Sequence, residues 1–340
     1  MLKINNRRYI GSKSKLLDFI NDSIIEFTDI GNEKFVFADL FAGTGVVSDY
    51  FSNKGHKVIL NDNLYSNFIA YQTWFSSGEI NQKKVQNIIN MFNEINPKYL
   101  NTNYFSNIYG DKYFSINASK KIGHIRDEIE LIKEDLTDRE YYTLITSLVY
   151  ATDKIANTVG HFEHYLKIKP VKDDLVLLLP TNLIKRESEI YNQDANELVD
   201  KIVADLIYID PPYNARQYIN FYHVLENLAR WEKPTEFEGI SMKFKRDELK
   251  SGYSQAKASG LMQDLVDKCN SRYILVSYNN TYNAKSGASN NKMSEEVLKD
   301  ILNSKGKTIK IEIPHNHFNS GKTNFLNHKE LLFICKVGER

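Results

Sequence analysis

The tetrapeptide Asp210-Pro211-Pro212-Tyr213 holds residue types well suited to chemistry. It follows the apolar run Leu206-Ile207-Tyr208-Ile209, which predicts a buried strand that ends at the edge of a sheet. Two successive prolines fix φ and remove two backbone donors, so the Asp210 carboxylate and the Pro211 carbonyl form a site of hydrogen-bond acceptors only. Such a site suits a planar exocyclic amine, and the Tyr213 ring could stack on the attached heterocycle.

Acceptors are needed because the lone pair of an amine on an aromatic base is delocalised into the ring. Two hydrogen bonds from the amine to Asp210 and Pro211 would shift the nitrogen toward sp³ geometry and free the lone pair to attack a sulfonium methyl group. The alternative is a proline-stiffened loop with a surface tyrosine. The preceding strand and a glycine turn upstream favour the chemical interpretation.

The glycine turn is Asp39-Leu40-Phe41-Ala42-Gly43-Thr44-Gly45, between an apolar strand and a helical pattern. A third glycine at the spacing of a dinucleotide fingerprint is missing, because Ser48 stands there. Asp39 would repel a pyrophosphate but attract an ammonium or sulfonium group. Asp62, after the next strand, is placed to accept hydrogen bonds from both ribose hydroxyls of an adenosine. S-adenosylmethionine therefore fits this unit better than NAD.

Seven short apolar runs predict the strands of a doubly wound, parallel α/β sheet whose ligands sit at the carboxyl ends of the strands. They cover residues 35–40, 57–60, 189–192, 204–209, 272–277, 308–313 and 331–335. Helical periodicity dominates in between, notably over 125–136 and 141–155. We therefore predict a catalytic domain from 1–75 and 185–340, with a mainly helical subdomain inserted over 76–184.

These motifs, in this order, resemble the α-class (D12-type) DNA N6-adenine methyltransferases of restriction–modification systems. The resemblance implies a Rossmann-like fold that uses S-adenosylmethionine to methylate an adenine flipped out of duplex DNA. It makes the inserted subdomain the target-recognition element. It also assigns catalysis to the tetrapeptide, that is, to Asp210, Pro211, Pro212 and Tyr213.

The same resemblance implies the cofactor site. Arg8-Tyr9-Ile10-Gly11-Ser12-Lys13 looks like the N-terminal cofactor motif of the family, although many members have a double glycine where this chain has Gly11-Ser12. Asp194 looks like the residue that bonds the adenine amine of the cofactor. The implied cofactor-binding residues are Tyr9, Gly11, Lys13, Asp39, Phe41, Gly43, Gly45, Asp62, Asp194 and Asp210.

Basic residues must bind DNA locally, because 44 Lys and Arg against 43 Asp and Glu give a net charge of only +1. Five positive charges and no negative one lie in residues 1–15, and 13 basic against seven acidic residues lie in 239–310. The inserted subdomain has no basic excess and would read bases through specific side chains. The predicted DNA contacts are Arg8, Lys154, Asn157, Arg216, Lys243, Lys245 and Arg246.

Other features bound the class of protein. The two cysteines, Cys269 and Cys335, lack metal-ligand spacing, and His161-x-x-His164 lacks a third ligand, so we expect no metal site. No apolar run approaches the roughly 18 residues that a membrane span needs, so we expect a cytoplasmic protein without a membrane partner. A cognate restriction endonuclease would be a separate protein.

Three other functions compete with this hypothesis. The same scaffold could methylate amino groups of RNA or protein. An NAD-dependent oxidoreductase is disfavoured by Ser48 and the tetrapeptide. A catalytically inactive DNA-binding relative is disfavoured by the intact Asp210-Pro211-Pro212-Tyr213.

Overall fold

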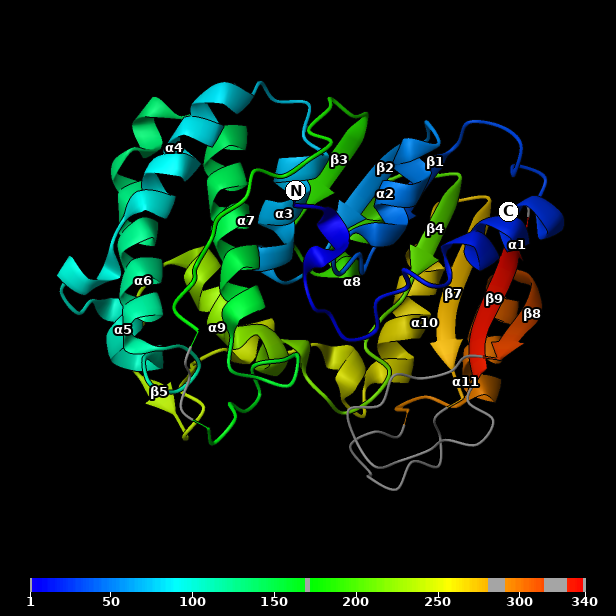
Figure 1. Ribbon diagram of the computed structural model, residues 1–340. Helices are drawn as coiled ribbons and strands as arrows, with labels where there is room; N and C mark the ends of the chain where they lie inside the picture. The colour runs from blue at the N-terminus through cyan, green and yellow to red at the C-terminus, as the bar shows by residue number, and fades with distance from the viewer. Residues whose placement is uncertain (1, 169–171, 281–290, 315–328, 339–340) are drawn as a thin grey trace.

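One seven-stranded sheet holds the molecule together (Figure 1). The computed structural model describes residues 2–168, 172–280, 291–314 and 329–338. The strand order across the sheet is β3-β2-β1-β4-β7-β9-β8. The strands are β1 Val36–Asp39, β2 Lys57–Asn61, β3 Ser188–Tyr191, β4 Leu206–Ile209, β7 Tyr273–Asn279, β8 Gly306–Pro314 and β9 Lys329–Val337. All seven predicted strands are thus present, and the α/β class is confirmed.

The central strands are apolar on both sides because helices cover both faces of the sheet. Phe37 and Tyr208 belong to the core on one face, whereas Ala38 and Ile207 belong to the core on the other. The first face packs against α1 Leu17–Phe27, α2 Val46–Asn53 and α3 Tyr65–Trp74, and the second against α8 Ala195–Leu198, α10 Ala258–Lys268 and α11 Glu295–Lys305.

The sheet is parallel only in part, which corrects the all-parallel prediction. Strands β3, β2, β1, β4 and β7 run parallel, whereas β9 is antiparallel to both of its neighbours. The sequence carried a signal of this: isoleucines alternate with polar residues at Ile309, Ile311 and Ile313 of β8. Such alternation is typical of antiparallel strands with one solvated face, rather than of strands buried on both faces.

A bundle of helices stands beside the sheet, at the left of Figure 1. It contains α4 Gln82–Glu94, α5 Tyr104–Tyr109, α6 Ile116–Leu131 and α7 Asp138–Ile155, and α9 Tyr218–Arg230 packs against α3 and α7. Thr137 and Glu140 form a capping box at the start of α7. The Glu140 carboxylate also accepts the Asn81 N–H at 2.9 Å and pairs with Lys84 at 3.0 Å, which joins the beginnings of α4 and α7.

Helix α9 connects the helical bundle to the sheet. The buried Glu226 accepts the backbone N–H groups of Tyr65 and Ser66, at 2.8 and 2.9 Å, and so caps the start of α3. The Arg126 guanidinium of α6 donates to the carbonyls of Leu228 and Ala229 in the last turn of α9, at 2.9 and 3.2 Å. The C-terminal end of α9 is therefore held against α3 and α6 by two charged side chains, Glu226 and Arg126.

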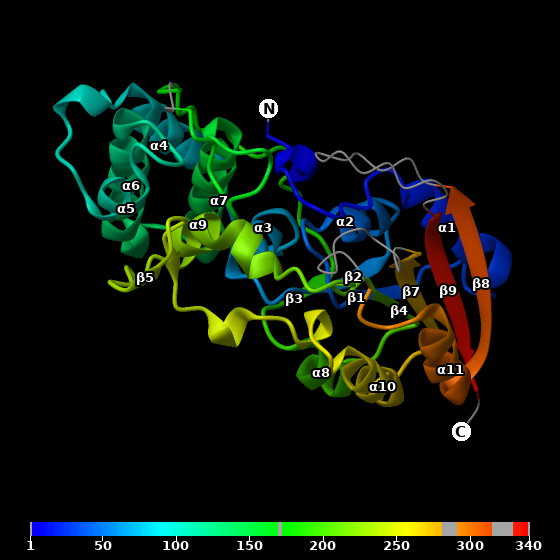
Figure 2. The same ribbon diagram turned by 90° about the horizontal axis from the view of Figure 1, so that it is seen from below.

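A short antiparallel hairpin, β5 Phe237–Glu238 and β6 Lys243–Phe244, follows α9 and was not predicted. It lies at the end of the helical bundle in both ribbon views (Figure 2). Its strands are two residues long, too short to give a period-2 signal in the sequence. In the described part of the chain, no helix is long and apolar enough to cross a bilayer.

Replacing Arg126 by Met should lower the free energy of unfolding by about 3 kcal/mol, because two carbonyls and the Glu130 carboxylate lose a buried charged donor. Urea unfolding followed by circular dichroism measures this. Lys83→Met, at an exposed position of α4, is the control and should change stability by less than about 0.5 kcal/mol. Equal effects of the two substitutions would contradict the role of Arg126.

Candidate active site

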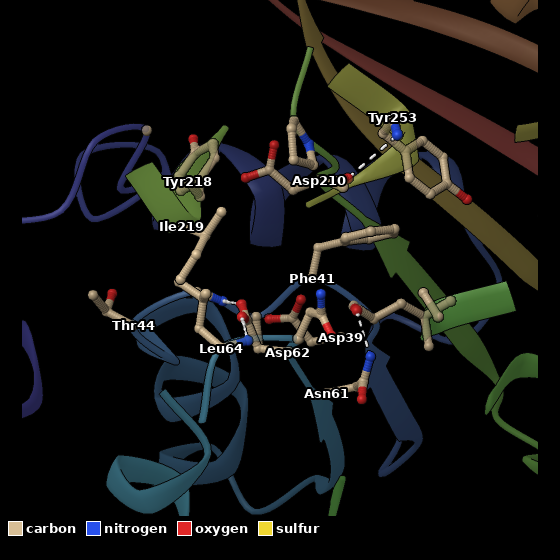
Figure 3. Close-up of a pocket in the computed structure, with 18 of the residues that line it drawn as sticks. Asp39, Phe41, Thr44, Asn61, Asp62, Leu64, Asp210, Tyr218, Ile219 and Tyr253 are labelled. Atoms are coloured by element: carbon tan, nitrogen blue, oxygen red, sulfur yellow. Dashed lines mark hydrogen bonds between the residues drawn. The ribbon is translucent and has the colours of Figure 1, made fainter. Parts of the chain in front are cut away.

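A cavity lies at the carboxyl ends of the parallel strands (Figure 3). Acidic residues at the carboxyl ends of four neighbouring strands line it: Asp39 as the last residue of β1, Asp62 after β2, Asp194 after β3 and Asp210 after β4. The figure shows Asp39 and Asp62 side by side, with Asp210 and Tyr218 across the cavity from them. The site predicted at this edge of the sheet therefore coincides with a cavity.

The glycine turn shapes the floor of the cavity. Gly43 and Gly45 adopt φ of +55° and +81°, which L side chains rarely adopt. A Cβ on Gly43 would lie 3.0 Å from the Tyr9 ring, so the turn also needs glycine for close packing. The Tyr71 hydroxyl donates to the Gly43 carbonyl at 2.6 Å and fixes the turn from below.

Asp62 is held by the backbone on both of its oxygens. One carboxylate oxygen accepts the Gly43 N–H at 2.9 Å and the other accepts the Leu64 N–H at 2.8 Å. Burial raises the pKa of Asp62 to about 6, and the two N–H groups oppose that rise. These bonds orient the carboxylate and leave its remaining lone pairs toward the cavity.

Asp39 is only half satisfied. Its side chain is 1% exposed, and Oδ2 accepts a hydrogen bond from the Ser48 hydroxyl at 3.0 Å. Its Oδ1 has no hydrogen-bond partner among the described residues. Burial raises the pKa of Asp39 to about 8. Since a buried acceptor without a donor is costly, this oxygen is prepared for a donor or a positive charge that enters the cavity.

Asp210 forms a compact cluster with Lys13 and Tyr213. The Lys13 ammonium lies 3.0 Å from Asp210 Oδ2 and donates to the Tyr213 hydroxyl at 2.8 Å. The Tyr213 hydroxyl in turn donates to Asp210 Oδ1. Burial raises the pKa of Asp210, and the Lys13 charge opposes that rise. The cluster corrects the expectation of an open acceptor site, because both Asp210 oxygens already have partners within the chain.

The N-terminal segment reaches Asp210 because distant residues hold it in place. Tyr9 stacks on Tyr222 of α9 with ring centroids 4.8 Å apart and planes 5° apart. The Ile10 N–H donates to the Tyr222 hydroxyl at 2.7 Å, and the Tyr218 hydroxyl donates to the Ile10 carbonyl at 3.2 Å. Lys13 itself is 5% exposed. The predicted cofactor residues Tyr9, Gly11 and Lys13 therefore all line the cavity.

Two aromatic side chains, Phe41 and Tyr253, line the cavity together with Asp194. Phe41 packs edge-on against Tyr253, with ring centroids 5.1 Å apart and planes at 82°. Asp194 is exposed, although one oxygen accepts the Asn196 N–H at 2.8 Å. Aromatic rings and a carboxylate in one cavity suit a planar base that carries an amino group.

The predicted cofactor residues come together, with one exception. Tyr9, Gly11, Lys13, Asp39, Phe41, Gly43, Asp62, Asp194 and Asp210 all line the cavity. Gly45 instead caps α2 behind the turn. Of the tetrapeptide, Asp210 and Pro212 line the cavity, Pro211 is buried, and Tyr213 packs edge-on against Tyr278 of β7 at 5.0 Å.

The predicted DNA contacts divide into two groups. Lys154, Arg216 and Lys245 are exposed, and Lys243 is half-buried. Arg8, Asn157 and Arg246 instead bond within the chain: Arg8 pairs with Asp153, Asn157 donates to three carbonyls, and Arg246 pairs with Glu238 and donates to Asn220. The 8% exposure of Arg246 and the three bonds of Asn157 point to structural roles.

Sequence reasoning missed Tyr218, Tyr253 and Asn61. Asn61 bonds the Leu40 and Gln193 carbonyls, both at 3.1 Å, and so fixes the turns after three strands relative to one another. Tyr218 could have been found, since it begins the helix that follows the tetrapeptide. Tyr253 lies 43 positions beyond Asp210 in a short 3₁₀ helix, Gly252–Ser254, and no local pattern singles it out.

Comparisons with known proteins identify the family. The model of the D12 class N6 adenine-specific DNA methyltransferases matches residues 9–285. Modification methylase StsI of Streptococcus sanguinis is 38% identical over 311 residues, 87% of this chain and 46% of that protein. Type II methyltransferase M.FokI of Planomicrobium okeanokoites is 33% identical over 334 residues, 92% of this chain and 50% of that protein. The chain thus spans about half the length of these two relatives.

A third relative matches over nearly its whole length. Type II methyltransferase M.NlaIII of Neisseria lactamica is 28% identical over 333 residues, which cover 94% of this chain and 95% of that protein.

Replacing Lys13 by Met should lower the free energy of unfolding by about 2 to 3 kcal/mol, because Asp210 loses its buried counter-charge. The loss should shrink as the pH falls from 8 to 5.5, since the pKa of Asp210 is already raised by burial and rises further without Lys13, so acid neutralises the unpaired carboxylate. Urea unfolding at both pH values measures this. The double variant Lys13→Met, Asp210→Asn should recover most of the stability at pH 8. A pH-independent loss without such recovery would contradict the ion pair.

Proposed function

Because the chain belongs to the D12 class of N6 adenine-specific DNA methyltransferases, we propose that its cavity binds S-adenosylmethionine and that it methylates N6 of adenine in a specific sequence of duplex DNA. The observation that carries the proposal is the arrangement of Asp39, Asp62 and Asp210 around one cavity. The three carboxylates follow adjacent strands, so a cationic ligand and an amine would meet between them.

The residues of the cavity fit the cofactor. The open Asp39 Oδ1 would accept the ammonium group of the methionine end. Asp62, oriented by two backbone N–H groups, would accept both ribose hydroxyls. Phe41 and Tyr253 would enclose the adenine, and Asp194 would accept its amine. When bound, the cofactor supplies an electrophilic methyl group on a positively charged sulfur.

Asp210 would act on the amine that receives the methyl group. Its carboxylate and the Pro211 carbonyl would accept the two N–H bonds of adenine N6 and concentrate the lone pair on nitrogen. Formation of the N–C bond would accompany cleavage of the bond between sulfur and the methyl group, which leaves a neutral thioether. The nitrogen would then be cationic and would lose one proton. Asp210 would accept that proton, and its raised pKa suits that role. The product then carries one N–H and one methyl group.

Tyr213 would have to turn away from Asp210 before the adenine enters. Its hydroxyl now occupies Asp210 Oδ1, the position that the amine would take. Once released, the ring would stack on the extruded base. Lys13 would remain on Oδ2, so it would keep Asp210 ionised and oriented during the exchange.

The wider context follows from the same family. We assign sequence recognition to the helical subdomain over 76–184, to the exposed basic residues Lys154, Arg216 and Lys245, and to the half-buried Lys243. The enzyme would be the modification component of a restriction–modification system, working in the cytoplasm beside the chromosome. A separate endonuclease would recognise the same sequence. Transfer of a tritiated methyl group from the cofactor to DNA, rather than to RNA or protein, tests the substrate class.

Replacing Asp210 by Ala should lower the rate of methyl transfer to DNA by about 10³-fold or more, because the amine loses both its activating acceptor and its proton acceptor. Tritium transfer to unmethylated plasmid DNA measures the rate. Cofactor affinity, measured by calorimetry, should change by less than about threefold because Asp39 and Asp62 remain. Asp200→Asn, on the exposed surface, is the control. Near-normal turnover of Asp210→Ala would refute the assignment.

Cofactor affinity should rise with pH between 6.5 and 7.5, by up to about tenfold, because Asp39 must lose its proton to accept a cation and its pKa is about 8. Calorimetry in buffers of different ionisation enthalpy should detect proton release on binding. In Asp39→Asn, binding should be weak and nearly independent of pH over this range. A wild-type affinity that is flat across the range would show that Asp39 does not hold the cation.

A further inference from the structure

The turn of the β5–β6 hairpin presents one large apolar side chain to solvent. Gly239 and Met242 flank the turn with φ of +64° and +51°, and the Met242 N–H donates to the Gly239 carbonyl at 3.2 Å. Ile240 occupies the first central position of this turn and is 75% exposed. Polar residues, glycine and proline are usual at such positions, and the fold gains nothing from isoleucine there.

The turn is held rigidly from the inside. Ser241 is 5% exposed, its hydroxyl donates to the Glu163 carbonyl at 2.8 Å, and its own carbonyl accepts from the Tyr113 hydroxyl at 3.2 Å. Arg246 binds Glu238 across the base of the hairpin and Asn220 of α9. Because Ser241 is fixed inward, Ile240 must point outward. The strained φ of Met242, a non-glycine residue, is maintained by the same contacts.

A neighbouring loop is fixed in the same way and offers a similar surface. The Asn157 side chain donates to the carbonyls of Leu166 and Ile168, at 3.0 and 2.8 Å. The Phe162 N–H donates to the Phe221 carbonyl of α9 at 2.7 Å, and the buried His223 contacts the Phe162 carbonyl at 3.0 Å. Val159, on this loop, is 57% exposed. Polar side chains thus hold the main chain in place at the hairpin turn and at this loop. An exposed apolar side chain lies beside each.

Two lysines closely follow the turn that carries Ile240. Lys243 and Lys245 lie on the second strand and just after it, and Lys154 is exposed at the end of α7. The nearby acid Glu238 is paired with Arg246, and Asp247 is paired with Lys250. Glu163, Glu232, Glu236 and Glu248 are further acids of this region. An apolar tip flanked by lysines matches duplex DNA better than an apolar protein surface.

The position of the hairpin agrees with a DNA contact. Strands β4 and β7 point downward in Figure 1, and the hairpin lies low in the same view, so it lies toward the side to which the carboxyl ends of these strands point. Helix α9 joins the two places: its first residues, Tyr218 and Ile219, line the cavity, and its Asn220 binds Arg246 of the hairpin. A duplex engaged at one place is therefore oriented at the other.

We propose that Ile240 is an apolar wedge that inserts at a base step of the bound duplex and assists extrusion of the target adenine; this rests on the proposed function. Insertion of an aliphatic side chain unstacks a step and bends the duplex, at a cost of a few kcal/mol that the protein contacts offset. Unstacking beside the target lowers the cost of moving the adenine into the cavity. Lys243 and Lys245 hold the flanking phosphates.

The experiment compares Ile240→Ala with wild type on two substrates. Long-read sequencing of DNA from cells that express the wild-type protein first gives the methylated sequence. A fully paired duplex of about 24 base pairs with that sequence, and the same duplex with a mismatched base opposite the target adenine, are then assayed by tritium transfer. Val203→Ala, a 68% exposed residue before β4, is the control.

Ile240→Ala should lower kcat/KM about tenfold or more on the paired duplex. On the mismatched duplex, where extrusion is already easy, its kcat/KM should stay within about twofold of wild type. Cofactor affinity should be unchanged. Val203→Ala should match wild type on both duplexes. An Ile240→Ala rate equal to wild type on the paired duplex would overturn the wedge, as would an equal loss on both duplexes. A change of oligomeric mass in light scattering without a change of rate would instead indicate a contact between copies.

The two proposals fail in different ways. If wild type transfers no methyl group to any DNA, the proposed function itself is wrong. If wild type methylates DNA and Ile240→Ala behaves as wild type, only the wedge is wrong.

Discussion

The structure depends on gathering several carboxylates at one edge of a parallel sheet. Carboxylates that follow β1, β2 and β4 face one cavity, where their mutual repulsion and loss of hydration would destabilise the fold. Each carboxylate has a different set of hydrogen-bond and ion-pair partners. Asp62 receives two backbone N–H groups and Asp210 receives Lys13 and Tyr213, whereas Asp39 receives the Ser48 hydroxyl on one oxygen and has no partner for the other among the described residues. The least compensated carboxylate is therefore the one best placed to attract a cationic ligand, and the most compensated one is the proposed base.

This arrangement explains why the N-terminal segment must lie against both parts of the molecule. Lys13 can reach Asp210 only if residues 7–13 run across the top of the cavity. Arg7 donates to Asn67 of α3 at 2.8 Å, Arg8 pairs with Asp153 of α7, and Tyr9 stacks on Tyr222 of α9. The helices thus position Lys13, which is the counter-charge of Asp210 at the end of β4. A substitution in the bundle could change catalysis without touching the cavity.

Local patterns in the sequence were sufficient for the strands, the glycine turn and the acids. The acids at 39, 62, 194 and 210 could be placed together because carboxyl ends of parallel strands meet at one edge. The hydrogen-bond and ion-pair partners of these carboxylates could not be predicted, since they depend on contacts between residues far apart in the chain. Lys13 and Asp210 are 197 positions apart yet 3.0 Å apart in space. Arg246 looked like a phosphate contact in a basic run, but Glu238 and Asn220 enclose it.

The same reasoning limits what net charge says about DNA binding in this chain. Arg8 and Arg246 belong to basic runs, yet both charges are balanced by acids of the fold. Among the described residues, the exposed lysines near the hairpin are therefore few, and counterion release alone would give weak, non-specific association. Specific affinity would then come from contacts that form only when the duplex is bent and a base is extruded. Binding and base extrusion would be one coupled event. A wedge for such an event must be held in a fixed position, and Ile240 on the rigid β5–β6 turn meets that need better than a flexible basic tail would.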